Sequence, residues 1–174
     1  MLTINVTGIP APQGSKRGFY NPGLGRVQMV ESSKKVKPWR QDVQAGVADT
    51  LALLADGTIT STANIPLTGP LIIAITFYLP RPGYHYGTGK NAGNLKANAP
   101  SYVDKKPDVD KLVRSTLDGL KEAGLYRDDA QVAQITAVKR YADAATGARI
   151  AVAPLTDAPA PAPSAAPGTE AVLF

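Results

Sequence analysis

The sequence predicts a single α+β domain in which a mixed β-sheet is packed by two helices. Short β-branched apolar segments occur near both ends of the chain and in its middle, as expected of strands. Two longer segments repeat apolar residues every three or four positions, which is typical of amphipathic helices. The chain has 174 residues, of which 44% are hydrophobic. That length supports one hydrophobic core and is short for two ordinary domains.

The first third of the chain predicts a strand, a long connection and a helix. Leu2 to Thr7 alternates apolar and polar residues, which indicates an opening strand. Residues 8 to 33 are rich in Gly, Pro and basic residues and predict a long exposed loop or an irregular hairpin. A helix is expected from Pro38 to about Asp56-Gly57. Its apolar side carries Trp39, Val43, Val47, Leu51 and Leu54.

The middle of the chain predicts a buried strand and a second helix. Leu71 to Leu79 is almost continuously apolar and short, so it favours a buried strand. Residues 83 to 106 show no periodicity and predict a second long loop that contains the chain's single histidine, His85, as an ordinary loop residue. After Pro107 the apolar spacing returns, with Asp108 placed to cap the start of a helix and Gly124 to cap its end.

The remaining residues predict two strands and a tail. Val132 to Tyr141 and Ala148 to Ala153 indicate strands joined by a turn, together suggesting a hairpin. We therefore place one domain at 1–153. Residues 154 to 174, rich in Pro and Ala, predict a disordered tail because such a segment buries too little surface to offset its ordering entropy.

Composition excludes several classes of protein. The chain has no cysteine and one histidine, so disulfide frameworks, thiolate zinc sites and histidine-rich metal sites are excluded. No apolar run approaches the roughly 18 residues that cross a bilayer, and the first residues lack the pattern of a secretion signal. The expectation is a soluble, cytoplasmic protein.

Positive charge is concentrated in the folded part. The net charge is +5, and it rises to +7 when Asp157 and Glu170 of the tail are left out. The first forty residues carry one acidic residue, Glu31, against these basic ones: Lys16, Arg17, Arg26, Lys34, Lys35, Lys37 and Arg40. Nucleic acid is a plausible partner, although lysine-rich loops also serve solubility alone.

Acidic residues gather where the second helix begins and where it ends. Asp108 and Asp110 stand at its start, and Asp128 and Asp129 follow its end. If Pro107 keeps Asp108 extended, the first two carboxylates could converge on one ion. A third could join them if the chain doubled back beside the start of the helix. The alternative is that Asp108 only caps the helix while the later pair lies in a solvated turn.

Oxygen ligands without His or Cys suit a hard cation. Enzymes that cleave phosphodiesters commonly use Mg²⁺ or Mn²⁺ bound by a few carboxylates and water.

A longer pattern resembles a known family. It runs Pro107-Asp108-Val109-Asp110-Lys111-Leu112, then Leu117-Asp118-Gly119-Leu120, then Gly124-Leu125-Tyr126-Arg127-Asp128-Asp129-Ala130-Gln131-Val132. This resembles the signature of RusA-like Holliday junction resolvases, and the opening Gly8 to Arg17 is similar to phage members of that family. The spacing of the whole run is far more specific than a lone pair of aspartates.

The resemblance implies an activity and a set of site residues. It implies a homodimer that resolves four-way DNA junctions by paired nicks in recombination, repair or phage DNA processing, with Asp108, Asp110 and Asp129 as catalytic metal ligands. The family's lysine one turn beyond the second aspartate is replaced here by Arg114, which keeps the charge but does not readily release a proton. Lys111 is the alternative for that role, and Arg114 could instead pair with Asp110 or Asp118.

Other assignments are open at this stage. Lys16, Arg17 and Arg26 are candidates for gripping DNA phosphates. A non-catalytic basic DNA-binding protein, or a metal nuclease acting on other branched or single-stranded DNA, would share many of these features.

Overall fold

The computed structural model describes residues 1–14, 16–31, 33–61 and 64–156, so most of the predicted tail lies outside the described residues. Residues 154–156, which we had assigned to that tail, belong to the fold, because Leu155 donates from its backbone N to Pro70 O at 2.7 Å. Among the described helices, none is both long enough and apolar enough to cross a membrane.

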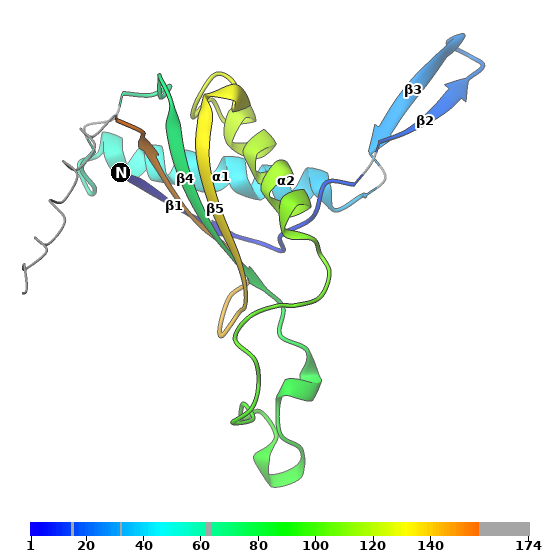
Figure 1. Ribbon diagram of the computed structural model, residues 1–174, viewed down its shortest axis with the longest axis vertical. Coiled ribbons are helices and arrows are strands. Elements are labelled where there is room, and N and C mark those ends of the chain that lie inside the picture. The colour runs from blue at the N-terminus through cyan, green and yellow to red at the C-terminus, as the bar shows by residue number, and fades with distance from the viewer. Residues whose placement is uncertain (15, 32, 62–63, 157–174) are drawn as a thin grey trace, which may run out of the picture.

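A four-stranded mixed sheet forms the centre of the molecule (Figure 1). Its order is β1-β6-β4-β5, formed by β1 (Leu2–Thr7), β6 (Gly147–Pro154), β4 (Leu71–Leu79) and β5 (Val132–Tyr141). β6 pairs antiparallel with both β1 and β4, whereas β4 and β5 are parallel. Two helices cover one face of this sheet, which confirms the predicted α+β class.

The apolar run of β4 explains its central position. Every second residue of this strand is buried, and the residues between are mostly half-buried, so the strand needs a neighbour on each side. β5 takes one side and β6 the other. The predicted β5–β6 hairpin is therefore wrong: the turn after β5 carries the chain across β4, and β6 pairs on its far side.

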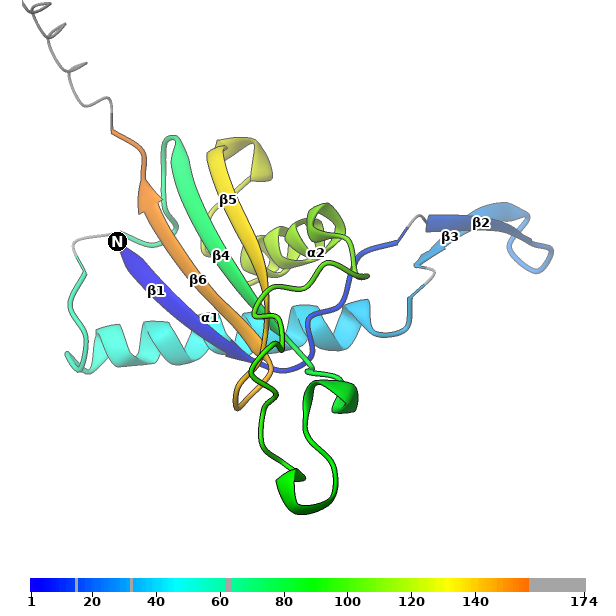
Figure 2. The ribbon, with the colours of Figure 1, turned by 60° about the horizontal axis from the view of Figure 1, so that its bottom comes forward.

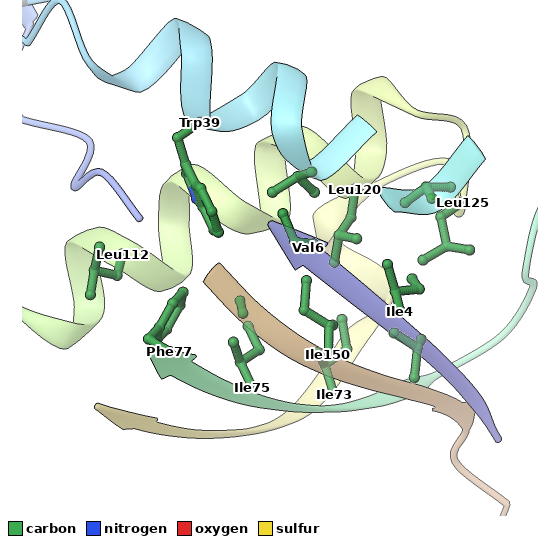
Figure 3. Close-up of a cluster of buried hydrophobic side chains, with 14 of the residues drawn as sticks. Ile4, Val6, Trp39, Ile73, Ile75, Phe77, Leu112, Leu120, Leu125 and Ile150 are labelled. Carbon is green, nitrogen blue, oxygen red and sulfur yellow. The ribbon is translucent and has the colours of Figure 1, made fainter. Parts of the chain in front are cut away.

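The core lies between the sheet and helices α1 (Val36–Ala55) and α2 (Val109–Glu122), as Figure 3 shows. Trp39 is fully buried there, as its helical position predicted, and its indole N–H donates to Thr116 Oγ1 at 3.1 Å. This bond joins the two helices and satisfies a buried donor. The other large side chains that fill the core include Phe77, Leu112, Leu120, Leu125 and Ile150.

Helix α2 connects β4 to β5 and has well-defined ends. Asp108 stands at its N-cap position in extended conformation. At its end Gly124, with φ of +76°, donates to Lys121 O, and Leu125 N donates to Leu120 O. This is a Schellman motif, so the predicted capping glycine is confirmed.

Two segments project from the body (Figures 1 and 2). One is the antiparallel hairpin of β2 (Lys16–Asn21) and β3 (Arg26–Glu31), which confirms the hairpin alternative for residues 8–33. The other is the long loop after β4, which contains the short 3₁₀ helices η1 (Gly83–His85) and η2 (Gly89–Asn91). His85 differs from expectation, because it is buried and packs edge-on against the rings of Tyr84 and Tyr141.

Candidate active site at the start of helix α2

The segment that leads into α2 is fastened to the end of β5. The ammonium group of Lys139 donates to the backbone carbonyls of Lys105 and Pro107, each at 2.8 Å. Asp108 follows with φ of −69° and ψ of 138°, and its carbonyl accepts from Leu112 N at 3.2 Å. Its side chain makes no capping bond to the helix backbone. The Asp108 carboxylate is thus available for another partner.

That partner is Lys111, one turn into the helix. Lys111 Nζ lies 2.6 Å from Asp108 Oδ2, and both side chains are about half exposed. The hydrogen bond and charge of Lys111 lower the pKa of Asp108, and Lys106 and Lys139 add to the effect. Asp108 in turn raises the pKa of Lys111. The aspartate is therefore held as a carboxylate and the lysine as an ammonium.

Asp110 and Arg114 extend the site along α2. Asp110 is exposed in the first turn of the helix, and Arg114 is exposed one turn later. Of the two ion pairs considered for Arg114, neither is present among the described residues. Asp118 instead pairs with Arg40 of α1. Arg114 is therefore an exposed cation one helical turn beyond Asp110.

A groove of about 710 Å³ opens beside Asp108. Its lining is apolar at the base, with Leu79, Val103 and Tyr141, and basic at the rim. The basic lining residues are Lys35, Lys105, Lys106 and Lys111. The ammonium groups at the rim suit the binding of a nucleic-acid phosphate backbone. The carboxylate beside them suits a metal ion that would lie next to a bound phosphate.

The N-terminal segment forms one wall of this groove. Gln13 N donates to Lys111 O at 3.0 Å, and Ser115 Oγ donates to Ala11 O at 2.6 Å. These two bonds hold the segment after β1 against the first turns of α2. They also explain why residues around Gly14 line the groove with Asp108.

Asp129 lies at the other end of α2. It begins the short 3₁₀ helix η3 (Asp129–Gln131), and its Oδ2 lies 3.1 Å from Nζ of Lys121 in the last turn of α2. The helix has 14 residues, which corresponds to about 21 Å between its ends. In the part of the chain that the structure describes, no group of three His, Cys, Asp or Glu residues could hold one metal ion.

A site built from all three aspartates of one chain would require Asp129 to lie beside the start of α2. The chain does not double back to bring it there. The physical reason is the parallel pairing of β4 and β5, with Leu71 beside Val132 and Leu79 beside Tyr141. The start of β5, where Asp129 stands, is beside the start of β4. Asp108 follows the loop that leaves the end of β4. Asp128 caps η3 by accepting from Ala130 N at 2.8 Å, as the turn interpretation of that residue predicted.

The candidate DNA-gripping residues belong to the projecting hairpin. Lys16 and Arg17 begin β2 at the base of the hairpin, and Arg26 is exposed at the start of β3, opposite Asn21. Arg26 therefore lies near the tip, at the far end of the hairpin from Lys16.

Sequence reasoning missed Lys139 and the groove lysines Lys105 and Lys106. Lys139 stands in a strand pattern where nothing distinguishes it from a solvent-facing residue, and only its partners in the structure show that it fastens the loop. Lys105 and Lys106 directly precede the Pro107-Asp108 pattern, so their position was a usable signal.

A carboxylate paired with an ammonium group at a lysine-lined groove, with a second carboxylate and a guanidinium group exposed on the same helix, defines a class of site suited to phosphodiesters. Comparison with known families agrees. The family described as "Endodeoxyribonuclease RusA" matches residues 11–153, most of the chain. The protein belongs to this family, whose members are endodeoxyribonucleases that act on branched DNA junctions. Among curated proteins, no match was found.

Proposed function

We propose that this protein is an Mg²⁺-dependent crossover junction endodeoxyribonuclease that acts as a homodimer and resolves four-way DNA junctions by paired nicks. One observation carries the proposal. Asp108, the first aspartate of the family pattern, makes no capping bond to the helix backbone and lines a groove together with four lysines, and Asp110 is exposed in the first turn of α2.

One chain supplies only part of the carboxylate ligand set expected for a hard cation. Asp108 and Asp110 supply carboxylate oxygens, and Mg²⁺ is commonly held by one or two carboxylates together with water and substrate phosphate. Mn²⁺ accepts the same ligands. When bound, such an ion polarises the phosphate and lowers the pKa of an attacking water. The third aspartate of the pattern, Asp129, does not lie with these two in the same chain.

The other site residues have roles that follow from their charge and position. Lys35, Lys105 and Lys106 attract the backbone of a DNA arm into the groove. Lys111 keeps Asp108 ionised and brings an ammonium group close to a phosphate held there. Arg114 supplies a positive charge that stabilises the negative charge developing on the phosphate during attack.

The test is cleavage of a synthetic four-way junction beside a linear duplex, a flap and a single strand, each with Mg²⁺ or with EDTA. The proposal expects metal-dependent nicks in the junction and little cutting of the other substrates. Preferential cutting of the flap or single strand would favour a nuclease of different substrate choice. Binding without any cutting would favour a non-catalytic DNA-binding protein.

A further inference from the structure

The groove beside Asp108 has a lining that is largely apolar, which contact with phosphates alone does not require. It lies where the long loop after β4, the segment after β1 and the start of α2 meet (Figure 2). Leu79, Val103 and Tyr141 at its base are buried. Five prolines also line it: Pro10, Pro12, Pro80, Pro82 and Pro107. Because proline has a fixed ring and no N–H donor, these walls are stiff and suit an apolar group.

Tyr84 contributes an aromatic ring to the groove, and its neighbours hold that ring in place. Lys96 Nζ donates to Tyr84 O at 2.8 Å, and the backbone N of Lys96 donates to His85 O at 2.9 Å. The buried His85 ring packs edge-on against the rings of Tyr84 and Tyr141. Lys105 Nζ donates to the Tyr84 hydroxyl at 3.3 Å and lies 5.5 Å from the ring centroid. Tyr84 is thus held in place although it is 59% exposed.

An unpaired nucleotide matches both the apolar walls and the lysines of this groove. In a duplex the flat faces of the bases are covered by stacked neighbours, so an unpaired base is the one that can bring an apolar face to the protein. Bases stack on aromatic side chains, and lysines attract the phosphates that flank them. The volume of about 710 Å³ lies within the range of small-molecule sites, about 300–1,000 Å³.

We infer that the groove takes one unpaired base of the strand to be cut, with Tyr84 as its stacking platform and the adjoining phosphate beside Asp108. This inference rests on the proposed function, because the strand is an arm of the junction that the site would nick. Stacking is interrupted at a branch point, so a base there is released more easily than in a continuous duplex. The groove therefore selects for branched DNA.

Photocrosslinking tests whether a base enters the groove. 5-Iodouracil replaces single thymines near the branch point of a synthetic four-way junction, and the complex is irradiated in EDTA so that no strand is cut. A base stacked on Tyr84 should form an adduct with that residue, identified by mass spectrometry of the digested protein. A linear duplex of the same sequence should give no such adduct. An absent adduct at every junction position, or an equal adduct from the duplex, would overturn the inference.

Two tyrosines of the same loop provide a matched comparison of affinity. Tyr84→Leu should weaken junction binding in EDTA by roughly 5- to 150-fold, the range for losing one base stacked on an aromatic ring. Tyr84→Phe keeps the ring and should bind as the parental protein does. Tyr102→Leu is the control: Tyr102 is 58% exposed, but Arg140 lies over its ring at 4.9 Å and it does not line the groove. Equal affinities of Tyr84→Leu and Tyr102→Leu would overturn the role of Tyr84.

An abasic nucleotide separates the contribution of the base from that of its phosphate. At the crosslinking position, a junction with an abasic nucleotide is compared with one that has a mismatched base, since neither has a base pair to lose. The parental protein should bind the mismatched junction more tightly, and Tyr84→Leu should bind the two almost equally. Equal binding of both junctions by the parental protein would show that the lysines hold only the phosphate backbone, and would overturn the inference.

These experiments separate the groove from the proposed function, because none of them needs cleavage. A parental protein that nicks the junction with Mg²⁺ but forms no adduct at Tyr84 would overturn the inference and leave the proposed function intact. A parental protein that forms the adduct but nicks no junction with Mg²⁺ or Mn²⁺ would overturn the proposed function and leave the base in the groove. A parental protein that binds no DNA would overturn both.

Discussion

Lys111 donates to the carboxylate of Asp108 across one turn of helix α2, with 2.6 Å between Nζ and Oδ2. The carboxylate makes no bond to the helix backbone, so its principal partner in the structure is this ammonium group. The pair occupies the rim of the basic groove. Its electrostatic coupling makes the protonation of Asp108 depend on Lys111.

Lys111→Gln should therefore move the acid limb of the pH profile for nicking to higher pH. Lys111 lowers the pKa of Asp108, so the carboxylate is lost only as pH falls through a value below the usual range. Without the ammonium group, that pKa returns toward its ordinary value and Asp108 is protonated earlier. Lys111→Arg, which keeps the charge, should leave the limb in place. An acid limb that does not move in Lys111→Gln would contradict the coupling.

Asparagine at Asp108, Asp110 or Asp129 should abolish junction nicking without unfolding the protein. Each change keeps the shape of the side chain and removes a charge that a hard cation requires. The expected loss is at least about a hundredfold, the scale seen when one transition-state-stabilising group is removed.

Asp128→Asn is the matched control, since Asp128 caps η3 and Asn caps nearly as well. Metal titration followed by calorimetry should separate the three site variants from this control. Parental nicking rates in all three would refute the assignment of the site residues.

Arg114→Ala should reduce turnover much more than junction affinity. Arg114 is exposed and forms none of the intrahelical ion pairs considered for it, so its charge is free for a phosphate. The expected decrease is roughly one to two orders of magnitude in turnover. Arg114→Lys should recover most of it if charge alone matters. Equal losses in turnover for the Lys and Ala variants would indicate that the planar guanidinium is needed.

Thr116→Val should destabilise the fold by about 1–3 kcal/mol, because it leaves the buried indole N–H of Trp39 without an acceptor. Urea unfolding followed by tryptophan fluorescence measures the change. Thr50→Val is the control. Thr50 is also buried, but its hydroxyl donates to Gly46 O within α1, and its loss leaves no buried donor unpaired. Equal costs for the two variants would show that the bond between the helices contributes nothing specific.

Much of the fold could be predicted because its elements are specified locally. β1, β4 and β5 have the predicted bounds, since each is a β-branched, largely apolar or alternating segment followed by Gly8, by Pro80 or by the turn that ends at Gly147. Gly124 marked the end of α2 in the same way. Pairing between strands has no such local signal. The chain after β5 forms no hairpin because β4 needed a second neighbour, a requirement visible only in the assembled sheet.

The same limit applies to the candidate site. The aspartates at the start of α2 were found from their spacing, but the position of Asp129 depends on the parallel pairing of β5 with β4. The sequence placed Asp108 and Asp129 at opposite ends of a predicted helix, but it could not show whether the chain returns to the start of that helix. The role of Lys139 was hidden for a similar reason, because its partners are backbone carbonyls more than thirty residues away.

Cleavage of a cruciform extruded from a supercoiled plasmid tests the central claim most directly. A single nick releases the supercoiling and reabsorbs the cruciform, so linear product forms only when two opposed strands are cut within the lifetime of one complex. With Mg²⁺ present, the account predicts linear plasmid as the main early product, and intact supercoiled plasmid in EDTA. Nicked circles alone, or linear product at an equal rate from a plasmid without the cruciform, would contradict it.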